Sequence, residues 1–234
     1  MIPIFVGYDK RESVAYHTFC QSVLSRSSVP VSFTPLCLSS LDYDERHKDG
    51  SNEFTYSRFL VPSLMGFSGW AIFADGDMVC LDDIKKLWDM RDHSKAVMVV
   101  QHDYETKHPS KYLGARNENY PRKNWSSLIL WNCGHYMNKI LTKELIQESS
   151  GKELHRFEWL PDERIGDLPL EWNWLAGEYL YNANAKLIHY TLGTPCFKEY
   201  ARCDHASDWH RELSEVNNFT QVYKVNPAPL VGIR

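Results

Sequence analysis

Two carboxylates held one residue apart stand at the end of an apolar stretch near the middle of the chain. The segment that begins at Trp70 opens with an apolar run of the length of a buried strand, and the run stops at Asp75-Gly76-Asp77. Two like charges this close are costly unless water, a proton or a metal ion compensates them. Oxygen ligands favour Mg²⁺, Mn²⁺ or Ca²⁺. Gly76 permits backbone angles that direct both carboxylates toward one cation. The same residues also fit a plain polar turn, because Asp-Gly is a turn signal.

Strand and helix patterns alternate along the chain, and these elements must position the acidic pair. The first strand pattern, Ile4–Val6, precedes a polar turn at Gly7–Glu12 and helical spacing from Tyr16 to Leu24, which predicts a strand–helix unit. Further strand patterns cover 31–36, 96–100, 127–131 and 185–190, and short helices are expected over 59–65, 82–88 and 141–148. Alternation of this kind predicts an α/β fold with a mainly parallel sheet, in which ligands collect at the carboxyl ends of strands. The chain shows no linker, so we expect a single domain over residues 1–234.

Composition excludes several classes of protein. The net charge of −4 does not suggest a nucleic-acid binder, whereas 43% apolar residues suffice for a sizeable core. No apolar run approaches the length needed to cross a bilayer, and the first residues lack the basic region and cleavage site of a secretion signal. The six cysteines form no C-x-x-C pair, which fits a reducing compartment. We therefore expect a soluble, cytoplasmic protein.

A long polar segment, Gln101–Asn124, separates two of the strand patterns. It carries five basic residues: Lys107, Lys111, Arg116, Arg122 and Lys123. A segment of this length and character is expected to be a loop or a flap over a site, and the other interpretation is solvated surface.

With the acidic pair and His189 both at strand ends, the chain resembles the GT-A glycosyltransferases, most closely family 8. In that family an arginine-containing motif Y-x-R-L precedes Y-L-D-x-D, and here Tyr56-Ser57-Arg58-Phe59 precedes Phe73–Asp77. The later family motif H-F/Y-x-G is matched by His189–Gly193, with one extra residue before the glycine. The resemblance covers most of the chain. It implies a Rossmann-like, nucleotide-sugar-binding GT-A fold with a central, mainly parallel sheet flanked by helices.

The resemblance also implies a metal centre. Asp75, Asp77 and His189 are expected to hold Mn²⁺, or Mg²⁺, which bridges the diphosphate of a nucleotide-sugar, in the first place a UDP-sugar. Arg58 is expected to pair with Asp75 or with the phosphates, since its planar fork suits either partner. An arginine on a helix surface is the other interpretation of Arg58.

Donor contacts follow from the same resemblance. Gly7, Tyr8 and Asp9 are expected to meet the base, with Tyr8 stacking and Asp9 accepting a hydrogen bond, although a turn entering a helix explains them equally. Ser126 and Ser127 occupy the place of the family segment that holds the donor sugar. Gly76 and Gly193 complete the residues expected to contact the nucleotide-sugar.

The family's acidic D-Q-D loop beside the reactive carbon of the sugar is matched by Asp162 and Glu163, and a helix-initiating Pro-Asp-Glu is the other interpretation. The family's Lys-Pro-Trp ending is replaced here by Gly193–Phe197, so its phosphate-binding lysine has no counterpart at that place. Lys198 lies close by in the sequence, either as a substitute or as a surface lysine.

The leading hypothesis is a metal-dependent, retaining glycosyltransferase that moves a hexose from a UDP-sugar to the hydroxyl of a saccharide or other acceptor. Because no residue stands out as a covalent nucleophile, we favour a same-face substitution in which the leaving diphosphate helps to deprotonate the acceptor.

Two alternatives come from other classes. A haloacid-dehalogenase-like phosphatase also places Asp-x-Asp after a buried strand, with the first Asp as nucleophile. In this chain, however, the motif is not on the first strand, lacks the usual following Thr and leaves His189 without a role. A non-catalytic nucleotide- or carbohydrate-binding module would fit the tryptophans of the second half, Trp159, Trp172 and Trp174, which fit a core or an acceptor groove equally well.

Overall fold

The computed structural model describes residues 1–47 and 49–222, so residues 223–234 of the predicted domain lie outside the described part. The strands are β1 (Ile2–Gly7), β2 (Val31–Leu36), β3 (Trp70–Ala74), β4 (Met78–Cys80), β5 (Val97–Val99), β6 (Leu128–Asn132), β7 (Ile165–Asp167), β8 (Trp174–Leu175) and β9 (Leu187–His189). The α-helices are α1 (Ser13–Leu24), α2 (Val61–Leu64), α3 (Ile84–Trp88), α4 (Lys143–Glu148), α5 (Gly151–His155) and α6 (Ala206–Val222). Across 1–47 and 49–222, no helix has the length and apolar character needed to cross a membrane.

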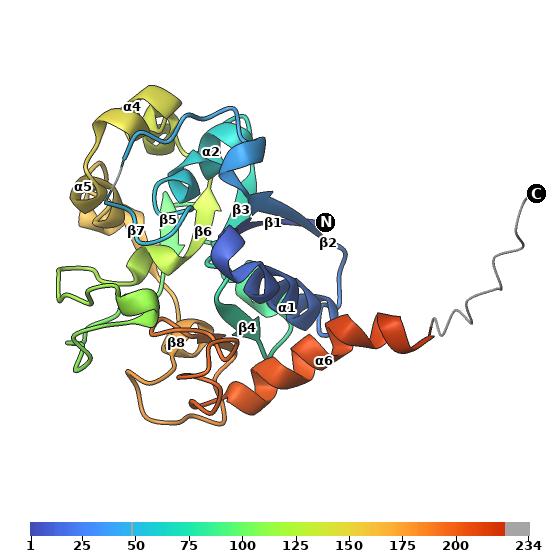
Figure 1. Ribbon diagram of the computed structural model, residues 1–234. Helices are drawn as coiled ribbons and strands as arrows, with labels where there is room; N and C mark the ends of the chain where they lie inside the picture. Colours follow the sequence, from blue (N-terminus) through green and yellow to red (C-terminus); the bar gives the residue numbers. More distant parts are fainter. Residues whose placement is uncertain (48, 223–234) are drawn as a thin grey trace, which may run out of the picture.

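A six-stranded sheet in the order β2-β1-β3-β6-β5-β7 forms the centre of the molecule (Figure 1). Strands β2, β1 and β3 are parallel, and β6 runs antiparallel to both of its neighbours, β3 and β5. Strand β7 pairs in parallel with β5. The prediction of an α/β fold with a mainly parallel sheet is confirmed.

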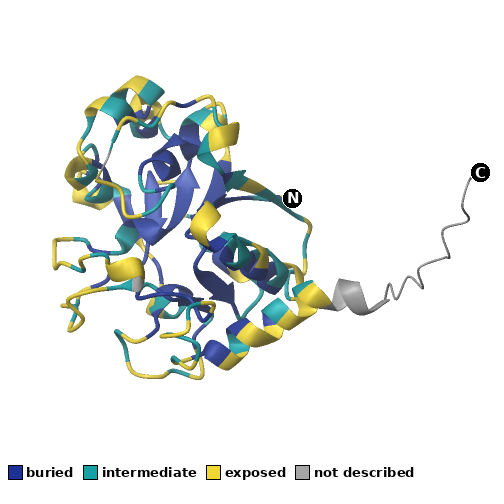
Figure 2. Cartoon of the chain, in the orientation of Figure 1, coloured by how far each residue is buried: buried dark blue, intermediate teal, exposed yellow. Residues whose placement is uncertain are grey.

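Both faces of the middle of this sheet are covered, which explains why β3 and β5 are apolar and buried over their whole length (Figure 2). Side chains of β3 alternate between the faces: Phe73 packs with Phe59 and Trp131 on one face, and Ile72 packs with Phe19 of α1 on the other. Helices α2, α4 and α5 contribute to the first cluster, whereas α1 and α3 contribute to the second.

A second, three-stranded sheet in the order β4-β9-β8 begins directly after the acidic pair. Strand β4 is antiparallel to β9, and β8 is parallel to β9. The chain therefore leaves the main sheet at Ala74 and enters the second sheet at Met78, with Asp75 and Asp77 at the junction.

Helix α6 lies beside α1 (Figure 1), where Arg26 pairs with Glu212 at 2.7 Å. Trp209 of α6 packs with Ile188 of β9 in the cluster of the second sheet. Helix α6 thereby connects the second sheet to the helix that covers the main one.

The strands expected from apolar patterns are present, with ends shifted by one or two residues. The helix expected over 59–65 is divided into a 3-10 turn, Ser57–Leu60, and α2, where Pro62 occupies the first turn and its missing N–H costs no hydrogen bond. Strands β4, β7 and β8 and helices α5 and α6 were not predicted.

Candidate metal and nucleotide-sugar site

The acidic pair is fixed by its backbone to the main sheet. The amide of Asp75 donates to the carbonyl of Ser127 at 2.9 Å, continuing the β3–β6 ladder by one bond. Gly76 approaches the end of β1 so closely that a Cβ atom there would lie 2.3 Å from the carbonyl oxygen of Gly7. The φ of Gly76 is not in the left-handed region. The expectation that Gly76 is needed for its backbone angles was therefore wrong. A glycine is required here because there is no space for a side chain.

His189 reaches the pair through the second sheet. In the β4–β9 register His189 stands opposite Met78, and the amide of Tyr190 donates to the carbonyl of Asp77 at 3.0 Å. The Nε2 atom of His189 lies 3.5 Å from Oδ1 of Asp77 and 3.9 Å from Oδ2 of Asp75. One ligand atom from each of the three residues lies within 4.8 Å of the others, and all three residues are buried. The expected juxtaposition of Asp75, Asp77 and His189 is thus present.

A chain of hydrogen bonds sets the orientation of the imidazole. The hydroxyl of Ser127 donates to the carbonyl of Asn124 at 2.7 Å, so it accepts the bond from Nδ2 of Asn173 at 2.8 Å. The remaining amide oxygen of Asn173 accepts from Nδ1 of His189 at 3.2 Å. In the neutral imidazole this leaves the lone pair of Nε2 directed toward the carboxylates. Such an outer partner fixes the tautomer that a metal ligand needs.

Burial and charge make the acidic pair receptive to a cation. The pKa of Asp75 is raised to about 7. Burial is the largest cause, the charge of Arg58 opposes it, and the charge of Asp77 adds to it. Among the described residues, the buried Oδ1 atom of Asp77 has no hydrogen-bond partner. An orphaned carboxylate oxygen is expensive. Two carboxylates and one imidazole form a mixed oxygen and nitrogen donor set that suits a divalent cation, so the residues present fit the expected metal.

Arg58 lies inside the protein, in the 3-10 turn before α2, and only 4% of it is exposed. Its Nη1 atom lies 2.8 Å from Oδ1 of Asp75 and donates to the carbonyl of Ser126 at 2.9 Å. Its Nε atom donates to the carbonyls of Phe54 and Thr55. Of the two partners expected for Arg58, the structure shows Asp75, and the surface interpretation of this arginine is wrong.

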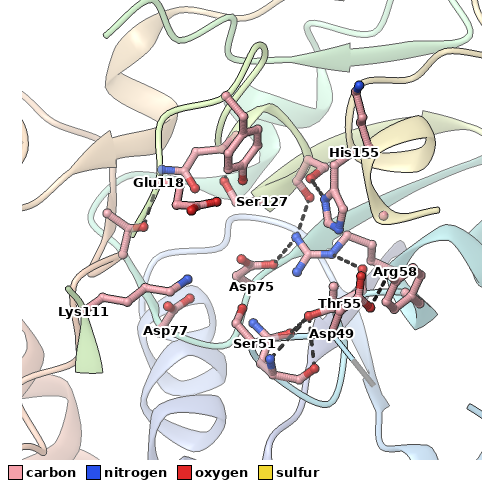
Figure 3. Close-up of a pocket in the computed structure, with 18 of the residues that line it drawn as sticks. Asp49, Ser51, Thr55, Arg58, Asp75, Asp77, Lys111, Glu118, Ser127 and His155 are labelled. Atoms are coloured by element: carbon pink, nitrogen blue, oxygen red, sulfur yellow. Dashed lines mark hydrogen bonds and ion pairs between the residues drawn. The ribbon is translucent and has the colours of Figure 1, made fainter. Parts of the chain in front are cut away.

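A pocket of about 600 Å³ opens over the acidic pair (Figure 3). Its lining includes the predicted residues Arg58, Asp75, Asp77, Ser126, Ser127 and His189. Basic side chains surround these residues: Lys111 and Arg116 come from the long polar loop, and Lys152 and Arg156 come from α5 and the residue after it. A pocket with this charge suits an anionic ligand.

Sequence reasoning did not single out several residues of this site, Lys152 and Arg156 among them. Two more make contacts with the predicted residues. His155 lines the pocket and its Nδ1 lies 2.6 Å from the hydroxyl of Ser126. Burial, with Arg58 close by, holds the pKa of His155 well below its usual value, so this imidazole is neutral. Asn173, the partner of His189, is the second. Each is a lone residue without a motif around it, and no sequence pattern marked either.

Several predicted donor contacts do not line the pocket as the structure describes it: Gly7, Tyr8, Asp9, Gly76 and Gly193. The carboxylate of Asp9 caps the turn that follows it and is bonded to the guanidinium of Arg11 and to the amide of Glu53. Arg11 in turn donates to the carbonyl of Ser51, which does line the pocket. The first strand–helix turn thus borders the pocket, and its role in binding a base stays a prediction.

The two residues expected beside the reactive carbon are also outside the described pocket lining. Asp162 pairs with Arg122 at 2.6 Å, and its side chain is 84% exposed. Glu163 is exposed. The predicted part of Asp162 and Glu163 in the reaction has no support from this geometry and stays a prediction.

The family model described as glycosyl transferase family 8 matches residues 10–195. Protein CDI of Arabidopsis thaliana is 46% identical over 224 residues, which cover 92% of this chain and 86% of that protein. The family resemblance inferred from the motifs is confirmed.

Solved structures share the fold. The galactosyltransferase LgtC in complex with donor and acceptor sugar analogs is similar with a TM-score of 0.57 and 11% identity, over 92% of this chain and 96% of LgtC. The apo structure of the bifunctional glycosyltransferase WbbM is similar with a TM-score of 0.61 and 17% identity, over 95% of this chain and 51% of WbbM. The chain therefore spans about half of the length of WbbM. At these identities the likeness shows the GT-A fold.

Proposed function

This chain belongs to glycosyl transferase family 8, which makes it a glycosyltransferase by class, and we propose that it moves a hexose from a UDP-sugar to an acceptor hydroxyl with retention of configuration. Asp75, Asp77 and His189 hold the divalent cation, Mn²⁺ or alternatively Mg²⁺. The observation that carries this proposal is the convergence of these three buried side chains under a pocket lined with basic groups.

The cation, when bound, supplies charge stabilisation for the departing diphosphate. The chain's own residues prepare its place. Arg58 orients the carboxylate of Asp75, and Asn173 orients the imidazole of His189. Ser126 and Ser127 line the pocket where a donor sugar is expected, and their hydroxyl groups are positioned by bonds to His155, Asn124 and Asn173.

The carboxylates that line the described pocket are Asp49, Asp75, Asp77 and Glu118. Asp75 and Asp77 serve the cation. Asp49 accepts a hydrogen bond from the hydroxyl of Tyr56 at 2.6 Å, and Glu118 pairs with Arg116 at 2.7 Å. Since each of these carboxylates already has a partner or a role, none is placed as a covalent nucleophile. This supports a same-face substitution: the acceptor oxygen bonds to the anomeric carbon, the bond to phosphate breaks, and the acceptor proton passes to a diphosphate oxygen.

The phosphatase hypothesis gains no support from the site. A nucleophilic aspartate must offer a free oxygen to phosphorus, whereas Asp75 is held by Arg58 and faces Asp77 and His189. A binding module without turnover is distinguished from an enzyme by the experiment below. The cytoplasmic location and the organisation as one domain stay predictions.

Release of UDP from a panel of UDP-hexoses, with saccharide acceptors and with either Mn²⁺ or a chelator, tests the proposal. We expect metal-dependent transfer with a retained anomer in the product. Asp77→Asn should weaken Mn²⁺ binding by at least about a hundredfold, since even residues that only support a metal ligand contribute 10- to 100-fold. Asp44→Asn is the matched control, because Asp44 is exposed.

Two results would count against the proposal. Absence of metal-dependent binding of any nucleoside diphosphate to the wild-type protein would contradict the whole of it. Tight binding of UDP without transfer to any acceptor would leave the binding module as the better account.

A further inference from the structure

A tight hairpin in the long polar loop carries Lys111 toward the acidic pair. Ser110 and Arg116 form an antiparallel bridge, and the amide of Lys111 donates to the carbonyl of Ala115 at 2.9 Å. The amide of Asn117 donates to the carbonyl of Pro109 at 3.0 Å. These bonds fix the backbone on both sides of Lys111.

Partly buried polar contacts tie the base of this hairpin to the rest of the protein. The ammonium of Lys123, which is 6% exposed, donates to Oδ1 of Asn117 at 2.6 Å and to the carbonyl of Glu118 at 2.9 Å. Thr106 donates to the carboxylate of Glu178, beyond β8, at 2.6 Å. The hairpin is therefore a built element that presents its side chains at a defined place.

The side chain of Lys111 points toward Asp77 and Asp75 in the pocket (Figure 3). Burial lowers the pKa of its ammonium, and the charges of Asp77 and Asp75 oppose that effect. Among the residues whose side chains the structure describes, none forms a hydrogen bond or ion pair with this ammonium. Its three donors are available to a ligand of the pocket.

The charges of the site balance without a metal ion. When both carboxyl groups are ionised, Asp75 and Asp77 carry two negative charges, and Arg58 and Lys111 face them with two positive ones. A divalent cation between the carboxylates adds two positive charges and repels Lys111. A diphosphate restores the balance and gives Lys111 a new partner.

The segment after Gly193, where family members have a phosphate-binding lysine, supplies no positive charge to the pocket. The segment Gly193–Phe197 contains no lysine, and Lys198 is exposed and outside the described pocket lining. Of the two lysines in the described pocket lining, Lys111 and Lys152, it is Lys111 whose charge acts on Asp75 and Asp77.

We propose that Lys111 is an exchangeable counter-charge: it neutralises Asp75 and Asp77 in the cation-free protein, and it contacts the donor diphosphate once a cation lies between them. This inference rests on the proposed function. It gives the long polar loop a part in binding the leaving group, from a position remote in sequence from Asp75, Asp77 and His189.

Calorimetric titrations of the full chain test this inference, first with Mn²⁺ alone and then with UDP at saturating Mn²⁺. Lys111→Met should strengthen Mn²⁺ binding on the order of threefold to tenfold, because a competing positive charge is gone. It should weaken UDP binding roughly tenfold to hundredfold, the value of a charge-assisted contact. Lys111→Arg should stay close to the wild type in both titrations. Lys107→Met is the matched control, since Lys107 is an exposed lysine of the same loop.

Opposite signs in the two titrations support the proposal, because a variant that merely misfolds would lose both ligands. Equal weakening of Mn²⁺ and UDP binding, or UDP binding equal to that of Lys107→Met, would overturn it. A wild-type protein that binds Mn²⁺ and no nucleoside diphosphate would instead refute the proposed function and the diphosphate half of this inference. The Mn²⁺ titration would still decide whether Lys111 competes for the carboxylates.

Discussion

Replacement of Arg58 by methionine should be among the most destabilising changes in this protein, although Arg58 lies in a short turn. Methionine keeps most of the apolar stem but removes the guanidinium, which contacts Asp75 at 2.8 Å and the carbonyl of Ser126 at 2.9 Å. Breaking a buried ion pair by removing one partner costs about 3–5 kcal/mol, because the other charge stays buried and unpaired. A surface substitution costs within about 0.5 kcal/mol. Arg46, which is exposed, provides that control as Arg46→Met.

The energy of the Arg58–Asp75 pair can be separated from the loss of the other hydrogen bonds of Arg58 with a second variant. Asp75→Asn removes the charge that Arg58 neutralises, so Arg58→Met should cost less in that background. We expect a coupling of about 2–3 kcal/mol, within the range measured for residues in contact. Because burial raises the pKa of Asp75 to about 7, a proton could partly replace the arginine. The measurement therefore belongs above about pH 8, where that carboxyl group is ionised.

Urea unfolding followed by tryptophan fluorescence, with a chelator present, gives the four free energies of unfolding. The slope with denaturant should stay the same in all variants if the native fold is kept. A cost for Arg58→Met no larger than that of Arg46→Met would refute the buried pair. Full additivity of Arg58→Met and Asp75→Asn would refute the coupling even if each variant alone were destabilised.

Three further predictions concern the surroundings of the acidic pair. Burial, with repulsion from Asp77, raises the pKa of Glu12 from 4.5 to about 8. The stability that protonated Glu12 contributes is therefore fully present below the pKa of the unfolded chain and is lost as the pH rises through about 8. In Glu12→Gln, the free energy of unfolding, measured with a chelator present, should depend less on pH between these two pKa values. Gly76→Ala should cost at least about 1–3 kcal/mol and weaken Mn²⁺ binding, because its Cβ would overlap a backbone oxygen, whereas Gly134→Ala, with room for a Cβ, should be tolerated in the same thermal unfolding assay. Asn173→Leu should weaken Mn²⁺ binding in calorimetry by roughly 10- to 100-fold through loss of the imidazole's orientation, and wild-type affinity in this variant would contradict that role.

The three residues of the candidate metal site could be predicted because they follow strong local signals. Asp75 and Asp77 come after an apolar run that is buried throughout, and His189 ends another. Periodicity and abrupt polarity changes are properties of a few neighbouring residues, which a sequence displays directly. The family motifs then joined these separate signals into one site, and the structure brings them together.

The parts of the site that escaped prediction depend on long-range pairing. Strand β4 has three residues, too few for a periodic pattern, yet its register with β9 is what sets His189 opposite Met78. Asn173 and His155 reach the site from turns and a short helix whose positions follow from packing. Strand β6 is antiparallel to its neighbours in a mainly parallel sheet. No sequence signal indicates this, because the apolar pattern of a buried strand is the same whichever way the strand runs in the sheet.

The junction between the two sheets explains why the acidic motif is so compact. Asp75 is tied by its amide to the segment before β6, and Asp77 is tied by its carbonyl to the residue after β9. Each aspartate thus belongs to a different sheet, and Gly76, pressed against β1, is the shortest connection between them. The separation of the carboxylates is therefore set by backbone hydrogen bonds on both sides, and not by side-chain contacts alone. We therefore expect a cation bound here to require little rearrangement of Asp75 and Asp77, and the exchange of Lys111 to be the main adjustment that its charge demands.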